Sequence, residues 1–222
     1  MTERTKSNTI AAAEKLRGLI FSGELAADSN HLETELAERL GMSRTPVREA
    51  SLMLAAQGLL QVQPRKGVRI TAISAQDMAQ IYEVLTELEC LAVRRAAQAG
   101  LSSADLEPLG ACIEQMEYAI ASEDRLGWST GDEAFHTELV RLGGNAHVEE
   151  IVRHYNDRVR RARAITLQMR PLPVKSNHDH RAVYEAILAG DGTSAEAVHR
   201  AHRTHAREML TDLLRQSDLR GA

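Results

Sequence analysis

The fold is decided by the stretch ELAERLGMSRTPVREASLMLAAQGLLQVQPRKGVRI, residues 35–70. Its first part predicts a helix over about 32–40 that stops at Gly41, because glycine is common directly after a helix end. A second helix is expected to begin at Ser43, a good N-cap residue, and to end near Gly58. Two helices separated by a short glycine turn are typical of a helix-turn-helix.

The residues around this pair complete a winged unit. An earlier helix, marked by apolar residues from Ile10 to Ile20, is expected to end at Gly23. Downstream, LLQVQPRKGVRIT predicts strand, turn and strand, with Pro64–Gly67 at the tip of a small wing. The sequence therefore predicts a winged helix-turn-helix domain over residues 1–73.

Charge is unevenly distributed along the chain. Residues 1–73 hold 10 of the 27 Lys and Arg residues and 8 of the 31 Asp and Glu residues, so this part carries +2 and the remainder −6. Within residues 39–69, six basic residues stand against the single acid Glu49. A local basic patch on an acidic protein is expected where one module meets phosphate.

The second helix of the pair exposes arginine near its amino end. With Val47 and Leu54 facing the core, Arg44 and Arg48 lie one turn apart on or beside the outward face. A recognition helix enters the major groove by its amino end, where arginine can bond guanine in a bidentate way. On an arbitrary helix two such arginines are most often a solvated face. Here the preceding helix, the turn and the basic wing all favour DNA binding.

The same residues carry a family resemblance. The quoted stretch, and SRTPVREA above all, resembles the winged helix-turn-helix of the GntR family of bacterial transcription regulators. The resemblance implies contacts to operator DNA from the amino end of the second helix and from the wing, with an addition from the helix before it. The expected DNA-binding residues are Thr34, Ser43, Arg44, Thr45, Arg48, Arg65, Lys66 and Gly67.

The remaining residues, 74–222, carry no strand pattern. Aromatic residues make up only 3% of the chain, while Ala, Leu, Arg and Glu abound, which favours helix over sheet. We therefore expect a mainly α protein in which an all-α helical bundle follows the winged unit. The six expected helices span 75–99, 103–122, 125–142, 146–169, 175–189 and 193–216.

The chain lacks the patterns of an exported or membrane protein. No run approaches 18 uninterrupted apolar residues, and MTERTKSNTIAAAEKL has no signal-peptide core. We expect a cytoplasmic protein with no membrane partner. Cys90 and Cys112 lack CxxC spacing, so buried free thiols are expected instead of a disulfide or a metal knuckle.

A carboxylate and an imidazole share one face of the third expected bundle helix, where DEAFH places Asp132 and His136 four residues apart. Single histidines from two other helices, His180 and His202, would complete a site of three imidazoles and one carboxylate. Such donors suit Zn(II), Ni(II) or another divalent transition metal. The spacing alone leaves open that any of these is a surface or hydrogen-bonded residue. The other histidines are interpreted as surface or hydrogen-bonded residues: His31, His147, His154, His178, His199 and His205. Among these, His205 is the main competitor to His202 as a ligand.

A second resemblance covers the helical part. The patterns DEAFHTEL, HDHRAVYEAILAGD and HRAHRTH resemble the FCD domain, the all-helical effector module of the FadR branch of the GntR family. Six helices fit its shorter VanR-like group. In many members an Asp and three His bind a metal, so the resemblance implies that Asp132, His136, His180 and His202 are metal ligands. It also implies that 74–222 binds an effector and dimerises.

One position departs from the family pattern. Where such domains often carry an arginine that pairs with an effector's carboxylate, YEVLTELE places Leu85. The pairing would then shift to the metal and another basic residue. Arg163 and Asn156, on the fourth expected bundle helix, are the candidate effector-binding residues. The alternative is that both are surface residues on a charged helix.

The expected function is a ligand-responsive transcription regulator, a repressor, that binds a pseudo-palindromic operator as a homodimer. A small-molecule carboxylate would bind a metal-containing pocket in the helical domain. Two alternatives stay open: a metal-dependent hydrolase fused to a DNA-binding head, and a DNA-binding protein whose helical domain only dimerises. No general-base or nucleophile motif accompanies the histidines, so an enzyme is not expected.

Overall fold

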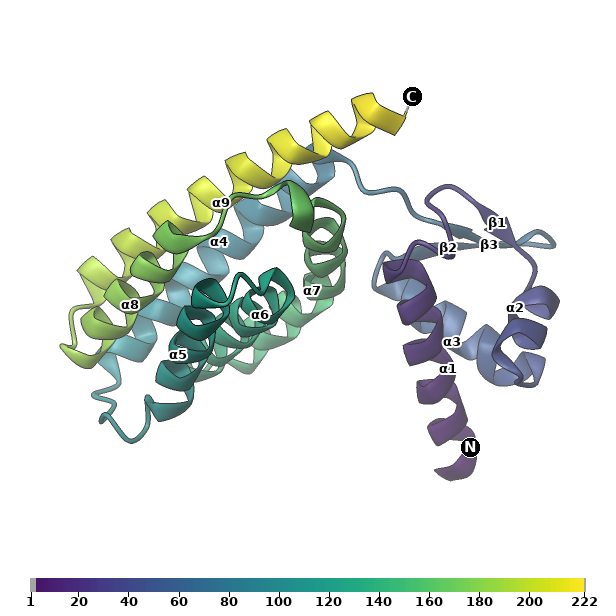
Figure 1. Cartoon of the computed structure of the whole chain (residues 1–222). Helices are drawn as coiled ribbons and strands as arrows, with labels where there is room; N and C mark the ends of the chain where they lie inside the picture. The colour runs from purple at the N-terminus through teal and green to yellow at the C-terminus, as the bar shows by residue number, and fades with distance from the viewer. Residues whose placement is uncertain (1–2, 222) are drawn as a thin grey trace. The chain divides into compact units, whose positions relative to one another are not determined.

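The structure is a computed structural model that describes residues 3–221. The chain divides between Ile73 and Ser74 into two compact units. The first is a small winged unit, and the second is a bundle of long helices (Figure 1). The fold is therefore mainly α, with an amino-terminal winged helix-turn-helix and a carboxy-terminal all-helical domain, as the sequence predicted.

Three helices build the winged unit: α1 (Glu3–Phe21), α2 (Glu33–Leu40) and α3 (Arg44–Ala56). Their buried apolar faces meet in one core, as expected for helices with an apolar stripe. Ile10 does not belong to this core, because it is 56% exposed. The apolar face of α1 was therefore predicted correctly at Leu16 and wrongly at Ile10.

The turn between α2 and α3 depends on Gly41. Its φ of 64° lies in the left-handed region, and its amide donates to the carbonyls of Ala37 and Glu38. Glycine adopts this conformation without the steric cost that a Cβ would add. Ser43 occupies the N-cap of α3 in an extended conformation, although its side chain makes no capping hydrogen bond.

The wing is part of a three-stranded antiparallel sheet with the order β1-β3-β2. The strands are β1 (Asn30–His31), β2 (Leu60–Gln63) and β3 (Gly67–Ile70). The sequence predicted the β2–β3 hairpin but not β1, because two residues are too few to show strand alternation.

Gly67 sits where β3 meets β1. A Cβ built at this position would lie 2.2 Å from the backbone oxygen of His31, and the φ of Gly67 is +84°. Both facts require glycine, because any side chain would overlap backbone and strain the main chain. The fold alone therefore accounts for glycine at the wing, where the sequence suggested an approach to DNA.

Six long helices form the second unit. α4 packs most extensively against α9, α5 against α6, and α8 against α9, around a buried apolar core. Their bounds are α4 (Ala75–Gln98), α5 (Glu107–Ala121), α6 (Arg125–Leu142), α7 (Ala146–Thr166), α8 (Val174–Leu188) and α9 (Gly192–Gly221), with a 3-10 turn η1 (Leu167–Met169) after α7.

Three predicted boundaries of the bundle helices differ from the structure by three residues or more. The helix expected from residue 103 begins at Glu107, because Pro108 has no N–H to donate and belongs in the first turn of a helix. The helix expected to run to residue 169 ends at Thr166, and the next residues tighten into η1. The last helix, expected to end at residue 216, continues to Gly221. All three differences lie at helix ends, where the apolar period carries least information.

The two cysteines agree in part with the expectation of buried free thiols. Cys90 and Cys112 are both free, but only Cys90 is buried. Within the described residues, none of the helices combines the length and the apolar character that crossing a bilayer requires.

We expect Gly67→Ala to destabilise the winged unit by about 2–3 kcal/mol, through backbone strain and overlap with His31. Urea unfolding of the full chain measures the loss, and hydrogen exchange of the peptides that contain β1 and β3 locates it. Gly18→Ala is the control, because a Cβ there meets nothing within 4 Å in a helix interior and should stabilise slightly. Equal stability of the two variants would contradict the steric argument.

Candidate functional site

The amino end of α3 presents polar and basic side chains to solvent. Arg44, Thr45 and Arg48 are exposed, whereas Val47 and Ala50 are fully buried in the winged unit. This division of the helix faces agrees with the sequence analysis. It leaves two guanidinium groups, one turn apart, available to a partner of opposite charge.

The wing and α2 border the same face. Five of the eight expected DNA-binding residues line one open hollow of about 330 Å³ between α2, α3 and the wing: Thr34, Arg44, Arg48, Arg65 and Gly67. The other three, Ser43, Thr45 and Lys66, are exposed but are not among the residues that line it. The structure therefore gathers side chains from three elements into one basic, solvent-facing surface.

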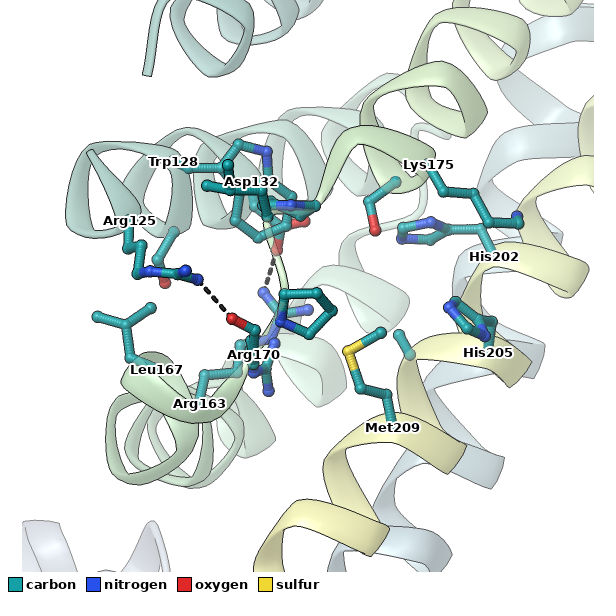
Figure 2. A pocket seen from close by; sticks show the side chains of 16 residues that line it. Arg125, Trp128, Asp132, Arg163, Leu167, Arg170, Lys175, His202, His205 and Met209 are labelled. Carbon is teal, nitrogen blue, oxygen red and sulfur yellow. Dashed lines mark hydrogen bonds and ion pairs between the residues drawn. The ribbon is translucent and has the colours of Figure 1, made fainter. Parts of the chain in front are cut away.

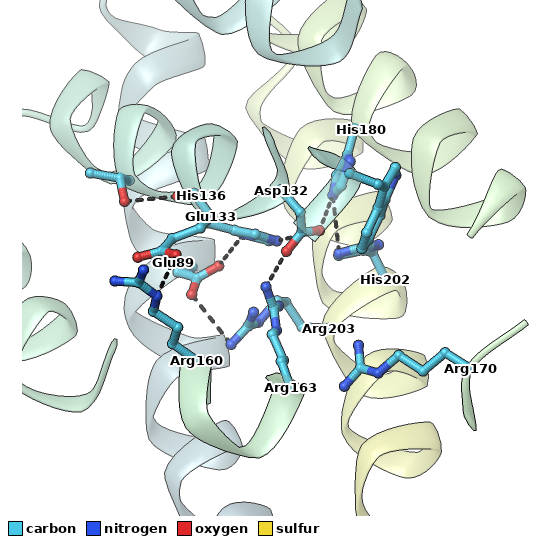
Figure 3. Close-up of polar contacts among 12 residues, drawn as sticks. Glu89, Asp132, Glu133, His136, Arg160, Arg163, Arg170, His180, His202 and Arg203 are labelled. Carbon is cyan, nitrogen blue, oxygen red and sulfur yellow. Dashed lines mark hydrogen bonds and ion pairs between the residues drawn. The ribbon is translucent and has the colours of Figure 1, made fainter. Parts of the chain in front are cut away.

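The four expected metal ligands also come together, from three helices of the second unit (Figure 3). Asp132 and His136 belong to α6, His180 to α8 and His202 to α9. One donor atom from each lies within 4.8 Å of the others. The four-residue spacing of Asp132 and His136 is what places both on the inner face of α6.

The donor atoms face one another. The Nε2 atoms of His136 and His180 lie 3.7 and 3.6 Å from Oδ1 of Asp132. The Nε2 atoms of His180 and His202 are 3.3 Å apart. All four side chains are buried, and Asp132 is only 1% exposed.

Burial and charge determine the protonation of this cluster. Burial opposes ionisation of Asp132, but the Arg163 guanidinium and the histidines outweigh it and hold the pKa of the carboxyl well below its usual range. Burial lowers the pKa of His180 and of His202. At neutral pH the cluster therefore holds a carboxylate together with the neutral imidazoles of His180 and His202, which are forms that bind metal ions.

Two further carboxylates orient the imidazoles. Glu89 of α4 lies 2.9 Å from Nδ1 of His136, and Asp179 lies 3.6 Å from Nδ1 of His202. An ionised carboxylate only accepts hydrogen bonds, so Nδ1 of His136 carries a proton, and in the neutral imidazole Nε2 then carries the lone pair. That Nε2 is buried and has no hydrogen-bond partner among residues 3–221.

The arrangement fits a divalent cation. With a neutral His136, its Nε2 lone pair and Oδ1 of Asp132 face each other at 3.7 Å, an arrangement that a cation between them would stabilise. Histidine held by an outer carboxylate is the usual support of a metal ligand. The residues that would hold the ion are Asp132, His136, His180 and His202.

The sequence analysis missed a second layer of charged residues. Glu89 also accepts a hydrogen bond from Nε2 of His199 at 2.9 Å and lies 3.3 Å from Nη2 of Arg203, which is 2% exposed. Burial opposes ionisation of Glu89, but Arg203 and His136 lower its pKa. Glu89, His136 and His199 are close enough to hold an ion themselves. However, both imidazoles already form hydrogen bonds with Glu89, and the guanidinium of Arg203 balances the charge of this carboxylate. We therefore interpret these three residues as support for the cluster around Asp132.

The signal that could have found this layer is helical spacing on α9. His199, His202 and Arg203 lie at intervals of three and four residues, which places them on one face. His199 was correctly assigned as a hydrogen-bonded residue, and His205, the expected competitor of His202, is exposed.

Arg163 does not lie on the surface. It forms an ion pair with Oδ2 of Asp132, and its Nε donates to the hydroxyl of Tyr82 at 3.4 Å. Asn156 is half-buried about two turns before Arg163 on the same face of α7, and both line a small cavity of about 30 Å³ together with Leu85. A cavity of this size holds only about two water molecules.

A larger pocket opens beside the cluster of Asp132 and the three histidines (Figure 2). Its volume is about 130 Å³, slightly less than the roughly 150 Å³ of a cavity known to hold benzene. Asp132 is the single acid in its lining, against four basic residues: Arg125, Arg163, Arg170 and Lys175. The pocket therefore favours a small anion.

His199 should make the metal-free protein less stable in acid. Burial lowers the pKa of its imidazole to about 4, compared with about 6.5 in an unfolded chain. Its contribution to stability is therefore fully present above pH 6.5 and is lost as the pH falls towards 4. We expect a loss of about 3 kcal/mol from this group across that window.

Urea unfolding of chelator-treated protein at pH 7, 5.5 and 4 measures this loss. His199→Gln keeps an amide donor for Glu89 but does not titrate, so it should remove this part of the slope. An unchanged slope would show that His199 is not the group concerned.

Comparisons with known proteins agree with the division into a winged helix-turn-helix unit and an all-helical unit. Residues 8–70 match the family of bacterial regulatory proteins called gntR, and residues 80–205 match the FCD domain. An uncharacterized HTH-type transcriptional regulator in an unstable DNA locus of Streptomyces ambofaciens is 33% identical over 90% of this chain and 83% of its own length. The HTH-type transcriptional repressor GlaR of Escherichia coli (strain K12) is 28% identical over 84% of this chain and 88% of its own.

The solved structure of E. coli McbR/YncC has the same fold, with a TM-score of 0.77 and 21% identity over 95% of this chain and 98% of that one. The matched families and relatives are transcriptional regulators and not enzymes, which removes the hydrolase alternative. The chain belongs to the GntR family of bacterial transcription regulators and carries an FCD effector domain.

Proposed function

We propose that this transcriptional regulator is a ligand-responsive repressor that binds a pseudo-palindromic operator as a homodimer. A divalent transition metal, Zn(II) or Ni(II), and a small carboxylate effector bind together in its helical domain. The observation that carries the proposal is the convergence of Asp132 and three imidazole nitrogens beside a pocket lined by cations.

The donor set supports the choice of metal. Three neutral imidazoles and one carboxylate are donors of the kind that Zn(II) and Ni(II) prefer. Such a set leaves coordination positions for a further ligand, and an effector's carboxylate would complete it. Bound there, the ion would supply a Lewis-acidic anchor for an anion, while Glu89 and Asp179 hold the imidazoles in place.

Charge and size together support the class of effector. Four basic residues face the pocket, and the volume of about 130 Å³ suits a molecule of roughly six to eight non-hydrogen atoms. Leu85 stands where related domains often have the arginine that pairs with an effector's carboxylate, so another basic residue must take this role. Arg163, which lies against Asp132, is that residue. A short-chain carboxylic acid satisfies both conditions.

The exposed basic face of the winged unit supports operator binding. Arg44 and Arg48 would reach base edges in the major groove, with Thr34, Ser43 and Thr45 beside them. Arg65 and Lys66 would contact the backbone from the wing. Two copies related by a two-fold axis would read half-sites about one helical turn apart. GlaR is named a repressor, which supports the same direction of control here.

Regulation follows from differential binding. An effector that binds one arrangement of the dimer more tightly than another changes operator affinity by that difference in free energy and no more. An effector that releases the repressor from DNA must therefore bind more weakly when the protein is on its operator.

We expect Arg44→Ala to weaken operator binding by about 5- to 150-fold at fixed salt, through loss of a bidentate base contact. The measurement is fluorescence anisotropy with the duplex that wild-type protein selects from a randomised pool. Arg39→Ala removes the same charge from the same unit, from a residue paired with Glu24, and should change affinity much less. Similar losses for both variants would reduce the effect to net charge.

We expect small carboxylic acids to raise the midpoint of thermal unfolding of the full chain only when Zn(II) is present after chelator treatment. His180→Ala should abolish this joint shift because it removes a buried ligand. His178→Ala changes an exposed histidine on the same helix and should leave the shift intact. A shift of equal size without metal would place anion binding on basic side chains alone.

A further inference from the structure

The two carboxylate oxygens of Asp132 face different groups. Its Oδ1 faces the Nε2 atoms of His136 and His180, where a divalent cation would lie. Its Oδ2 is bonded to Arg163. One buried carboxylate therefore serves both the metal-binding cluster and the pocket-lining arginine (Figure 3).

Arg163 is the link between the cluster and the pocket. Its side chain is only 11% exposed, lies against Asp132 and also lines the 130 Å³ pocket. A buried guanidinium needs an anionic partner, because an unpaired charge in this environment is strongly unfavourable. Asp132 is that partner here, so an incoming carboxylate must compete with a carboxylate already in place.

Arg170 marks where the incoming anion would lie. It lines the same pocket; its Nε donates to Thr166 at 3.2 Å, while its Nη2 is buried and lacks a hydrogen-bond partner in the described chain. Burial and the nearby positive charge of Arg163 lower the pKa of Arg170. A carboxylate between the two guanidinium groups would relieve this repulsion and satisfy the unpartnered donor (Figure 2).

We propose that Asp132 is an internal competitor of the effector: it holds Arg163 in the metal-free protein, and coordination of Asp132 to a divalent cation releases Arg163 to the effector's carboxylate. This inference rests on the proposed function, because it concerns the same pocket and the same class of ligand. Once the charge of Asp132 is shared with a cation, its bond to Arg163 weakens and Arg163 pairs with the effector. Metal and effector then bind with positive coupling, and by linkage each tightens the other by the same factor.

The competition makes an unusual prediction for Asp132→Asn. This variant loses a metal ligand, yet its neutral amide no longer holds Arg163. In chelator-treated protein we expect it to bind succinate about tenfold more tightly than metal-free wild type, a factor typical of coupled sites. Isothermal titration calorimetry with succinate, and with acetate as the monocarboxylate, measures the two dissociation constants.

Glu138→Gln is the matched control. It neutralises a carboxylate on the same helix, but one that pairs with Arg141 and does not line the pocket, so its metal-free affinity for succinate should equal that of wild type. Equal affinity of Asp132→Asn and metal-free wild type would overturn the competition. The proposed function would still stand if wild type showed the metal-dependent thermal shift. Tighter succinate binding by Asp132→Asn, without any metal-dependent thermal shift in wild type, would support the competition and contradict the proposed metal-dependent function.

A second variant keeps the inference testable if Asp132→Asn does not fold, as far-UV circular dichroism would reveal. Arg163→Gln frees Asp132 for the metal, so we expect it to bind Zn(II) several-fold more tightly than wild type when no acid is present. A chelating dye in competition measures this affinity. An arginine that merely orients Asp132 would have the opposite effect, a loss of about 10- to 100-fold, and that result would overturn the proposal. Added succinate should tighten Zn(II) binding to wild type but not to Arg163→Gln.

Discussion

The helical domain depends on the neutralisation of buried negative charge. Asp132 and Glu89 lie almost wholly out of water, where an isolated carboxylate would be unstable by many kcal/mol. Each is balanced by one buried arginine, Arg163 for Asp132 and Arg203 for Glu89, and by histidine. These side chains come from different helices, so the helices must pack correctly before the charges are satisfied. Arrangements of the bundle that leave either carboxylate unpaired are therefore disfavoured.

The same requirement produces the chemistry of the site. Glu89 accepts a hydrogen bond from Nδ1 of His136 and so turns the Nε2 edge of the ring towards Asp132, which creates a space suited to a cation. Because Arg163 neutralises the other oxygen of Asp132, a basic side chain is held at the edge of the pocket. Stability and ligand recognition therefore use the same groups. α4, which carries Glu89, follows the winged unit directly in the chain, so the helix that shapes the site is joined covalently to the part that binds DNA.

The two units differ in how far their sequences reveal them. In the winged unit the helices, the glycine turn and the hairpin follow from local signals, and Arg44 and Arg48 are exposed because Val47 fills the core. The missed strand β1 is two residues long and exists only because β3 pairs with it. Gly67 shows the same limit: its identity is explained by the backbone of His31, a residue distant in sequence.

The sequence by itself determined the mainly α fold, the winged helix-turn-helix and the identity of the four clustered residues, Asp132 and the three histidines. Apolar period, helix-end residues and family motifs, from which these were predicted, are local properties. Only the tertiary structure decided which groups face those residues. No spacing relates Glu89 to His199 or Arg163 to Asp132, since each pair joins different helices. Whether Arg163 is a surface residue or the partner of a buried carboxylate depends on how α7 packs against α6, and packing is a property of the whole bundle.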